Sequence, residues 1–440
     1  MKKFFLLFIL SIPFFVIAQQ LPEYKVTRYD TTDIKGYYFL TSINGSIVLD
    51  KDINVIYYQP NKAFFDFTMQ RKGLMVYQSN SYLYFIDSTF KVVDSFTTKN
   101  NVRLDSHDRL ILPNGNVILL GMEKAKISLS NYPDIAKTLK KDSLSLLFPV
   151  IQEQDKQHRL LFDWRGKDYF KVNDADSLMN DPGDIHSNAL ALDDDGNILL
   201  SSKNLNEITK INRKTGAIMW RLGGKRNEFK FINCPVPFYG QHDIKKTANG
   251  HYTLFDNGDS PVPHKARAME FELDETNKNA TLVWSYETDT TTEGRGSVQR
   301  LSDGNTLIGL GRHLGTDICF EIVSPSGKKI VQVNGLFAYR VKNYPELPFK
   351  LHRPVITCFD SAGVNYLDAG AGYKTYKWNT GDSTRIIKPK NAGSYYVFIS
   401  YGNSGYISSE KYIVSDILKP CDLKPSVNRN KKQVKTKKQN

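Results

Sequence analysis

The sequence predicts an all-β protein built from repeated sheets, and three observations support this prediction. Long stretches alternate apolar and polar residues, which is the period of a half-buried β-strand. Asp-Gly, Thr-Gly and Asn-Gly pairs, which are typical of tight turns, separate these stretches. A turn glycine recurs at Gly115, Gly196, Gly250 and Gly304, with spacings of 81, 54 and 54 residues. A four-stranded unit repeated about every 50 residues is typical of a propeller blade. We therefore expect a six-bladed β-propeller, with five or seven blades as alternatives.

The expected blades follow one another along the chain. Five are read directly from the strand pattern, and they cover residues 63–97, 103–166, 186–224, 241–287 and 296–333. The long second unit holds an insertion, residues 124–158, which lacks strand alternation and has room for a short helix. The sixth blade must combine residues 22–59 with residues 337–354. Because mixing strands from both ends removes exposed sheet edges, we expect residues 19–354 to form one closed propeller.

Residues 355–418 differ in composition and follow a Pro-containing link. They contain short strands and turns, and Trp378 suits a buried strand. The run from Asn391 to Tyr395 resembles the corner before a late strand in immunoglobulin-like domains. We expect a small Ig-like β-sandwich, similar to the Ig-like or PKD-like modules of bacterial secreted proteins, that serves in spacing or attachment. The polar and basic residues 419–440 are predicted to be a disordered tail.

The start of the chain predicts export. Lys2 and Lys3 precede an apolar run that ends in Val16-Ile17-Ala18, and this order is typical of a cleaved signal peptide, residues 1–18. We expect a periplasmic, secreted or cell-surface protein. The C-terminal module and the basic tail are candidates for attaching it to the cell envelope.

The formal charge of +13 does not indicate a nucleic-acid partner. Residues 419–440 carry eight Lys or Arg and one Asp, and the leader carries two lysines, so the rest of the chain has a charge of +4. The excess charge is therefore mostly a property of the tail.

The cysteines predict a disulfide rather than a metal site. Cys358 and Cys421 bracket the last compact segment, so we expect them to pair, since export permits disulfides. Reduced cysteines throughout, including Cys234 and Cys319, are the alternative. No zinc site is expected, because zinc ligands come as closely spaced pairs, and no other cofactor is expected.

Three histidines open equivalent strands of the repeat: His107, His186 and His242. They precede the turn glycines of their units by 8, 10 and 8 residues, and these even offsets predict that the three imidazoles lie on the same side of their strands. Equivalent strand ends converge at one end of a propeller channel, so we expect one shared pocket. The alternative is that each histidine only caps a turn or bonds a neighbouring blade. We rank anion binding above metal binding, because no carboxylate accompanies the histidines at ligand spacing.

Arg267 lies on the apolar side of its predicted strand, with Met269 and Phe271. A guanidinium in such a place needs an anion, which is either a structural carboxylate or a ligand that bears sulfate or phosphate. Two further substrate-binding candidates are Asn257 and Lys203. Their plainer interpretations are a turn former and a solvated lysine.

Four motifs together resemble the bacterial arylsulfate sulfotransferase family. They are HSNALALDDDGNILLSSKNLNEITKINRKTGAIMWRLGG, QHDIKKTANGHYTLFDNG, ARAMEFEL and SVQRLSDGNTLIG, within residues 100–335. The resemblance implies a six-bladed propeller and sulfuryl transfer from an aryl sulfate to a phenol without a nucleotide donor. It also implies an active site of histidines and an arginine. By motif, His186 and His242 match family histidines and Arg267 matches the arginine of the following strand.

One departure from the family concerns the nucleophile. The best-studied members use a sulfated histidine from a later blade, but residues 291–301 contain no histidine, and the nearest one is His313. We therefore expect His242 to be the nucleophile, attacking sulfur and giving ping-pong kinetics, with His186 and Arg267 also catalytic. His107, Asn257 and Lys203 would bind substrate. The alternative function is a non-catalytic surface propeller that binds sulfated or anionic glycans.

Overall fold

The computed structural model describes residues 22–42, 45–60, 65–69, 73–79, 81–89, 91–175, 183–259, 264–313, 317–347, 351–400 and 405–417. The predicted signal peptide and the predicted basic tail lie outside these residues. The regular secondary structure of the described part is nearly all β-strand, as expected, and its one α-helix is α1 (Pro133–Leu139). No helix within these ranges is long and apolar enough to cross a bilayer.

Most of the described strands form six antiparallel groups of four, each group a separate sheet or part of one. The first three groups are β29 (Ala338–Tyr344) with β2 (Tyr37–Ser42), β3 (Gly45–Leu49) and β4 (Val55–Pro60); β5 (Phe65–Met69), β6 (Met75–Gln78), β7 (Leu83–Ile86) and β8 (Val92–Phe96); and β9 (Arg103–Ile111), β10 (Val117–Ser128), β11 (Ser143–Gln154) and β12 (Leu160–Arg165). The other three are β14 (Ser187–Leu192), β15 (Ile198–Ser202), β16 (Glu207–Ile211) and β17 (Ile218–Gly223); β19 (His242–Lys246), β20 (Tyr252–Asp256), β21 (Arg267–Asp274) and β22 (Asn279–Glu287); and β24 (Ser297–Arg300), β25 (Thr306–Gly309), β27 (Ile318–Val323) and β28 (Lys329–Asn334).

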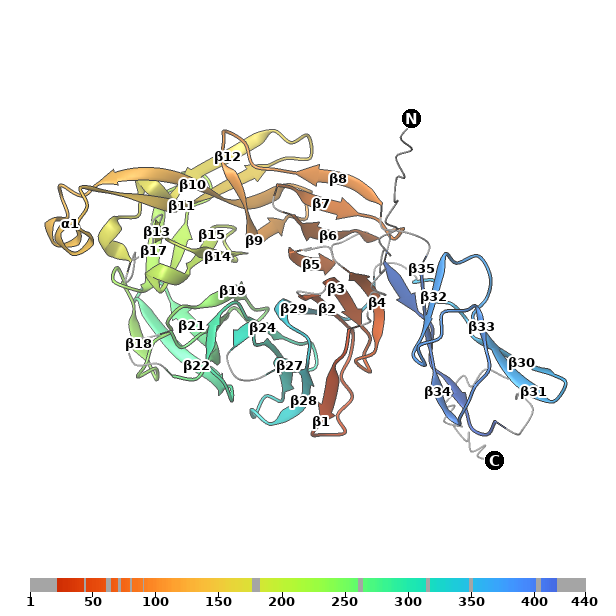
Figure 1. Ribbon diagram of the computed structural model, residues 1–440. Coiled ribbons are helices and arrows are strands. Elements are labelled where there is room, and N and C mark those ends of the chain that lie inside the picture. Colours follow the sequence, from red (N-terminus) through yellow and green to blue (C-terminus); the bar gives the residue numbers. More distant parts are fainter. Residues whose placement is uncertain are drawn as a thin grey trace, which may run out of the picture.

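One strand from each group faces a common centre, and we call these the inner strands: β5, β9, β14, β19, β24 and β29 (Figure 1). They contact one another in that order, and β29 contacts β5, so the ring of inner strands is closed. The closing strand comes from late in the chain. β29 pairs with β2, with Leu40 opposite Val341, which confirms that residues from both ends share one sheet.

Five of the six inner strands carry a register shift near the centre. The shifts lie between Phe65 and Thr68, Leu104 and Arg109, Ser187 and Ala189, His242 and Lys245, and Ala338 and Val341. Such β-bulges put extra residues on one strand, bend it and re-aim its side chains. Asp66 and Asp243 have positive φ within these shifts, and His186 has positive φ directly before the one in β14. The side chains near the centre are therefore directed by bulges rather than by the simple alternation of a strand.

The insertion expected at residues 124–158 is only partly helical. α1 confirms the short helix, but the expected lack of strand alternation on either side of it is wrong. β10 continues to Ser128 and β11 begins at Ser143, and the two pair along their whole length as an extended arm (Figure 1). Short alternating runs such as Lys124-Ala125-Lys126-Ile127 are enough to form strands here, because each strand pairs with the other strand of the same hairpin.

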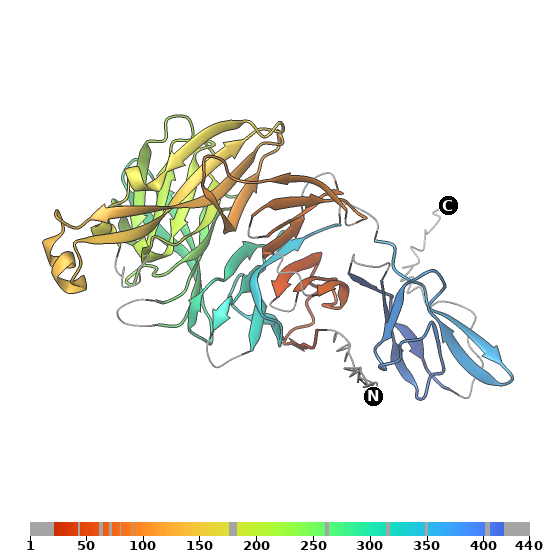
Figure 2. The ribbon, with the colours of Figure 1, turned by 45° about the horizontal axis from the view of Figure 1, so that its top comes forward.

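The C-terminal strands are short and lie to one side of the six groups (Figures 1 and 2). They are β30 (Thr357–Ser361), β31 (Val364–Asp368), β32 (Thr375–Trp378), β33 (Ile386–Ile387), β34 (Gly393–Tyr395), β35 (Val397–Ser400), β36 (Tyr406–Ser408) and β37 (Tyr412–Val414). Trp378 is buried, as predicted, and the hydroxyl of Tyr395 donates to the carbonyl of Asn391 at 2.7 Å.

This C-terminal segment shares a sheet with the first group, because β36 pairs with β4, with Ile407 opposite Tyr57. Both sides also contribute to one hydrophobic cluster, in which Phe39 and Ile56 lie with Trp378 and Val397.

The disulfide state of the cysteines is defined in part. Cys358 is disulfide-bonded, whereas Cys234 and Cys319 are free and buried. The expected partner of Cys358, Cys421, lies outside the described residues.

Candidate active site

His107, His186 and His242 come together at one end of the ring of inner strands. The ring centroids of His107 and His186 are 4.9 Å apart, and those of His186 and His242 are 6.2 Å apart. They border a cavity of about 330 Å³, whose lining residues are Ser106, His107, His186, Lys203, His242, Glu293, Gly294, Arg295 and Tyr339. These residues come from the sheets of β9, β14, β19 and β29 and from the segment before β24. The site therefore exists only after most of the chain has folded.

His242 presents one defined ring nitrogen to this cavity. Its Nδ1 lies 2.7 Å from Oδ1 of Asn257 and 3.0 Å from the carbonyl oxygen of Gly240. The side-chain amide of Asn257 donates to Thr292 and to the carbonyl of Arg295, so its oxygen faces the imidazole. Two acceptors at Nδ1 require the proton to be there, which leaves the lone pair on Nε2.

The environment also keeps His242 neutral. Its side chain is almost fully buried, and this burial, together with the neighbouring positive character of His186, holds its pKa well below the usual range. Above the ring lies Gly294, where even a Cβ atom would come within 3.7 Å of Cε1 of His242. A larger residue there would cover the imidazole. His242 is thus a neutral base or nucleophile that borders the cavity.

His107 and His186 differ from His242 because each has a carboxylate partner two residues earlier in the chain. Nδ1 of His107 lies 2.5 Å from Asp105, and Nδ1 of His186 lies 3.1 Å from Asp184. Burial alone would lower the pKa of His107, but the charge and hydrogen bond of Asp105 outweigh it and raise the pKa. Burial would also raise the pKa of Asp184, but the hydrogen bond from His186 lowers it.

The carboxylates correct the expectation that no acid accompanies the histidines. The sequence carries the pattern in plain form, as Asp105-Ser106-His107 and Asp184-Ile185-His186, whereas Gly240-Gln241-His242 lacks the acid. This two-residue spacing is the sequence signal that distinguishes the two kinds of histidine. No group of three or more His, Cys, Asp or Glu side chains in the described ranges is arranged to hold a metal ion.

Two cationic side chains complete the cavity. Lys203, a predicted binding residue, lines it and lies 3.0 Å from Asp259 and 3.3 Å from the carbonyl of Glu293. Arg295 was not predicted. It lies between two glycines with a positive φ, and its guanidinium lies against the rings of Phe337 and Tyr339, 5.1 and 6.0 Å from their centroids. It falls in the 291–301 segment, where the resemblance implies a histidine.

Arg267 is not in this cavity. Its Nε and Nη2 lie 2.8 and 2.6 Å from Oδ2 of Asp256, and Nη2 also donates to the carbonyls of Val236 and Pro237. Asp256 is directly opposite Arg267 in the β20–β21 ladder, so register alone supplies the carboxylate. Of the two partners expected for Arg267, a structural carboxylate or a ligand anion, the structure shows the carboxylate. It does not bring Arg267 to the histidines.

Asn257 is close to the site without lining it. It is 1% exposed, and it acts on Nδ1 of His242 rather than on the cavity. Of the six predicted residues, four line the cavity, one orients a histidine and one lies outside. Nothing is described for the side chain of His313.

The chain is similar to solved structures at low identity. They include a protein of unknown function from Bacteroides caccae, with 12% identity and a TM-score of 0.47 over 70% of this chain and 98% of that one. Virginiamycin B lyase from Staphylococcus aureus has 13% identity and a TM-score of 0.37 over 78% of this chain and 96% of that one. At these scores the similarity supports no conclusion about fold or function.

The family of the chain is shown by its sequence. No curated protein matches it. The model of the arylsulfotransferase (ASST) family, however, matches residues 24–331, which is more than half of the chain and includes every residue that lines the cavity except Tyr339. The chain therefore belongs to the arylsulfotransferase family.

Proposed function

We propose that this protein is an arylsulfate sulfotransferase that moves a sulfuryl group from an aryl sulfate to a phenol through a histidine adduct, without a nucleotide donor. The observation that carries the proposal is the contrast among the three imidazoles around one cavity. His242 is held neutral, with the lone pair on Nε2, whereas His107 and His186 are backed by carboxylates. A cavity of about 330 Å³ suits a small aromatic ester.

In the first half-reaction Nε2 of His242 attacks the sulfur of the ester. The N–S bond forms as the bond between sulfur and the aryl oxygen breaks, and the leaving phenolate takes a proton from His107. The proton on Nδ1 of His242 stays between Asn257 and Gly240, so the positive charge that develops on the ring is hydrogen-bonded. Arg295 and Lys203 would hold the sulfuryl oxygens as negative charge shifts.

In the second half-reaction the acceptor phenol gives its proton to His107 and its oxygen attacks the sulfur. The N–S bond breaks, the electron pair returns to Nε2, and His242 is neutral again. Every proton and bond of the first half-reaction is thereby restored, and the product is an aryl sulfate of the acceptor. This exchange predicts ping-pong kinetics with no cofactor.

The fold that we propose around this site is a six-bladed propeller followed by an Ig-like module. The closed ring of inner strands and the six groups of four strands support the first part. The buried Trp378 and the hydrogen bond from Tyr395 to Asn391 support the second. The cavity would then lie at one mouth of the propeller channel.

We also propose that the protein is exported and attached to the envelope by its C-terminal module and tail. A disulfide at Cys358 supports this, because disulfides persist in oxidising compartments. Fractionation of the cells with mass spectrometry of the N-terminus tests it. A cytoplasmic protein that begins at Met1 would contradict export.

A coloured ester such as 4-nitrophenyl sulfate, with and without excess phenol, tests the proposed activity. We expect chromophore release that accelerates with phenol, a sulfated His242 peptide in mass spectrometry without acceptor, and loss of both in His242→Ala. His158→Ala is the matched control, because this partly exposed histidine pairs with Asp94 and does not line the cavity. Binding of the ester without release would instead support a non-catalytic protein that binds anionic ligands.

A further inference from the structure

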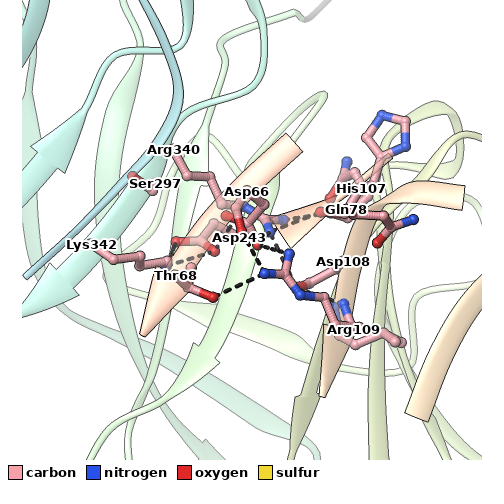
Figure 3. A network of polar contacts seen from close by, with 12 residues as sticks. Asp66, Thr68, Gln78, His107, Asp108, Arg109, Asp243, Ser297, Arg340 and Lys342 are labelled. Carbon is pink, nitrogen blue, oxygen red and sulfur yellow. Dashed lines mark hydrogen bonds and ion pairs between the residues drawn. The ribbon is translucent and has the colours of Figure 1, made fainter. Parts of the chain in front are cut away.

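We infer that Arg340 is a positioning residue for this site, because its guanidinium ties together the three chain segments that carry the cavity histidines. The inference rests on the proposed function. Arg340 lies on β29, beyond residue 331 where the family match ends, and its side chain is 1% exposed. It does not line the cavity. It belongs to a buried polar network with Asp66, Asp108 and Asp243 (Figure 3).

For each cavity histidine, Arg340 contacts either that residue or one that lies no more than two positions away in the chain. Nη1 donates to the backbone carbonyl of His107 at 2.9 Å, and Nη2 donates to that of Asn188 at 2.6 Å. Nε forms an ion pair with Asp243 at 3.3 Å, and Nη1 forms another with Asp108 at the same distance. Asn188 is two residues after His186, and Asp243 follows His242 directly. One planar group therefore sets the spacing of three inner strands.

The β-bulges explain why a guanidinium is needed at this point. His107 and Asn188 lie within the bulged stretches of β9 and β14, where the strand ladder is interrupted. Their carbonyl oxygens need donors, because an unpaired buried carbonyl is costly. The fork of Arg340 supplies two donors in a fixed plane as well as a charge. A lysine would supply the charge from a single mobile nitrogen.

Arg340 is not the only cation that balances the negative charges of the network. Its three carboxylates are all buried, and each has a second cation. Asp66 pairs with Arg109 at 2.5 Å, Asp108 with Lys245 at 3.0 Å and Asp243 with Lys342 at 2.9 Å. Removal of Arg340 would therefore leave each carboxylate with at least one cationic partner, and Asp243 with two, Lys342 and Lys245. Lys245 and Asn188 also bridge these strands, through the Leu190 and Gln241 carbonyls. Arg340, in contrast, binds the backbone of a cavity histidine itself, so we expect its loss to affect the geometry of the site.

Arg340 also acts on His107 through its charge. The charged or titratable groups that face His107 are Asp105 on its own strand, Asp184 and His186 from the next segment, and Tyr339 and Arg340 on β29. The positive charge of Arg340 opposes Asp105 and acts to lower the pKa of His107. Loss of this charge must raise the pKa of His107, whereas a lysine in its place should retain much of the effect.

The test compares Arg340→Met, Arg340→Lys and Lys210→Met in the full-length protein. Lys210 is the matched control, because it is a buried cation whose side chain is 3% exposed and which binds Asp193, Asp195 and Glu275 far from the cavity. One measurement is kcat and KM for 4-nitrophenyl sulfate. The other is the pH midpoint at which diethyl pyrocarbonate modifies His107 without substrate, followed by mass spectrometry, since this reagent attacks the neutral imidazole.

We expect kcat to fall about 100-fold in Arg340→Met with a smaller change in KM, which is the order of loss for an ångström-scale misplacement of reacting groups. The midpoint of His107 should move to higher pH. Arg340→Lys should also lose kcat but keep the midpoint near that of the wild type. Lys210→Met should lower thermal stability and leave both kcat and the midpoint unchanged.

A folded Arg340→Met protein with wild-type kcat and an unshifted midpoint would overturn the inference. If Arg340→Met does not fold, Arg340→Lys decides, because wild-type kcat in that variant would show that the fork is dispensable. If the wild-type protein turns over no aryl sulfate, the proposed function fails. The midpoint of His107 still tests the role of Arg340 in that case, because it requires no turnover.

Discussion

Nδ1 of His242 lies 2.7 Å from the side-chain oxygen of Asn257, and this contact decides which nitrogen of His242 faces the cavity. The contact places a buried amide, 15 residues away in the chain, at the ring nitrogen that does not react, and so leaves Nε2 for the reaction. It also separates His242 from the other two cavity histidines, whose Nδ1 atoms meet carboxylates. Three imidazoles in one pocket thus have different chemistry because their partners differ.

The first prediction concerns the charge at this contact. Asn257→Asp places a carboxylate beside His242 and should raise its pKa, so that the neutral nucleophile is populated only at higher pH. We expect the acidic limb of the kcat/KM profile to move to higher pH. Asn257→Ala is the control, since it removes the orienting oxygen without adding a charge and should lower kcat without that movement. A profile for Asn257→Asp that matches the wild type would contradict the role given to His242.

The second prediction concerns Asp105 and the pH dependence of stability. The pKa of His107 is raised in the folded state, so this pair stabilises the fold fully below the ordinary histidine pKa of about 6.5, and the contribution is lost as pH rises through the folded pKa. Asp105→Asn should therefore reduce the free energy of unfolding more at about pH 5.5 than at about pH 9. Urea unfolding at both pH values measures this. An equal loss at both would show that the interaction does not depend on the proton.

The third prediction separates two arginines. Arg267→Ala leaves the buried carboxylate of Asp256 without its guanidinium and should cost about 3–5 kcal/mol in the free energy of unfolding. Arg295→Ala removes a cation from the cavity and should lower kcat about 100-fold, as expected for one lost oxyanion donor. Thermal unfolding and kinetics on both variants give the comparison. The assignment is reversed if Arg267→Ala is fully stable but inactive.

The fourth prediction concerns the thiols. Cys234 and Cys319 are buried, and burial raises the pKa of both thiols, so neither should react with iodoacetamide in the native protein at about pH 8. After unfolding without reductant, mass spectrometry should find these two labelled and Cys358 unlabelled, because Cys358 is in a disulfide. Label on Cys358 under those conditions would be inconsistent with the bond.

The fifth prediction concerns the C-terminal segment. Removal of residues 355–440 exposes the edge of β4 and apolar side chains such as Ile56, because β36 no longer pairs there. We expect a lower melting temperature and aggregation, since a bare strand edge pairs with other chains. Removal of residues 423–440 alone is the control, since it keeps Cys421 as the expected partner of Cys358, and it should change neither. A shortened chain that ends at residue 354 and stays monomeric with wild-type stability would show that the two parts fold independently.

Much of the architecture was predictable because it depends on local rules. Alternation with period two and turn glycines such as Gly196 and Gly250 locate the strands to within a few residues, and this does not depend on where the strands lie in the fold. The repeat predicted that His107, His186 and His242 are equivalent, and their rings do meet. The reason differs from the predicted one, however. β-Bulges, and not the even offsets along regular strands, set the direction of the side chains near these histidines.

The sequence by itself determined most of the strands, the repeat and the equivalence of the three histidines, since each of these follows from neighbours in the chain. The tertiary structure alone decided which charges meet. Arg267 is satisfied by Asp256 across a ladder, Arg295 reaches the cavity from a glycine-flanked turn, and Arg340 enters the centre on the closing strand. A buried charge takes whichever partner the packed strands bring within reach, and that distance is set only when strands far apart in sequence are side by side.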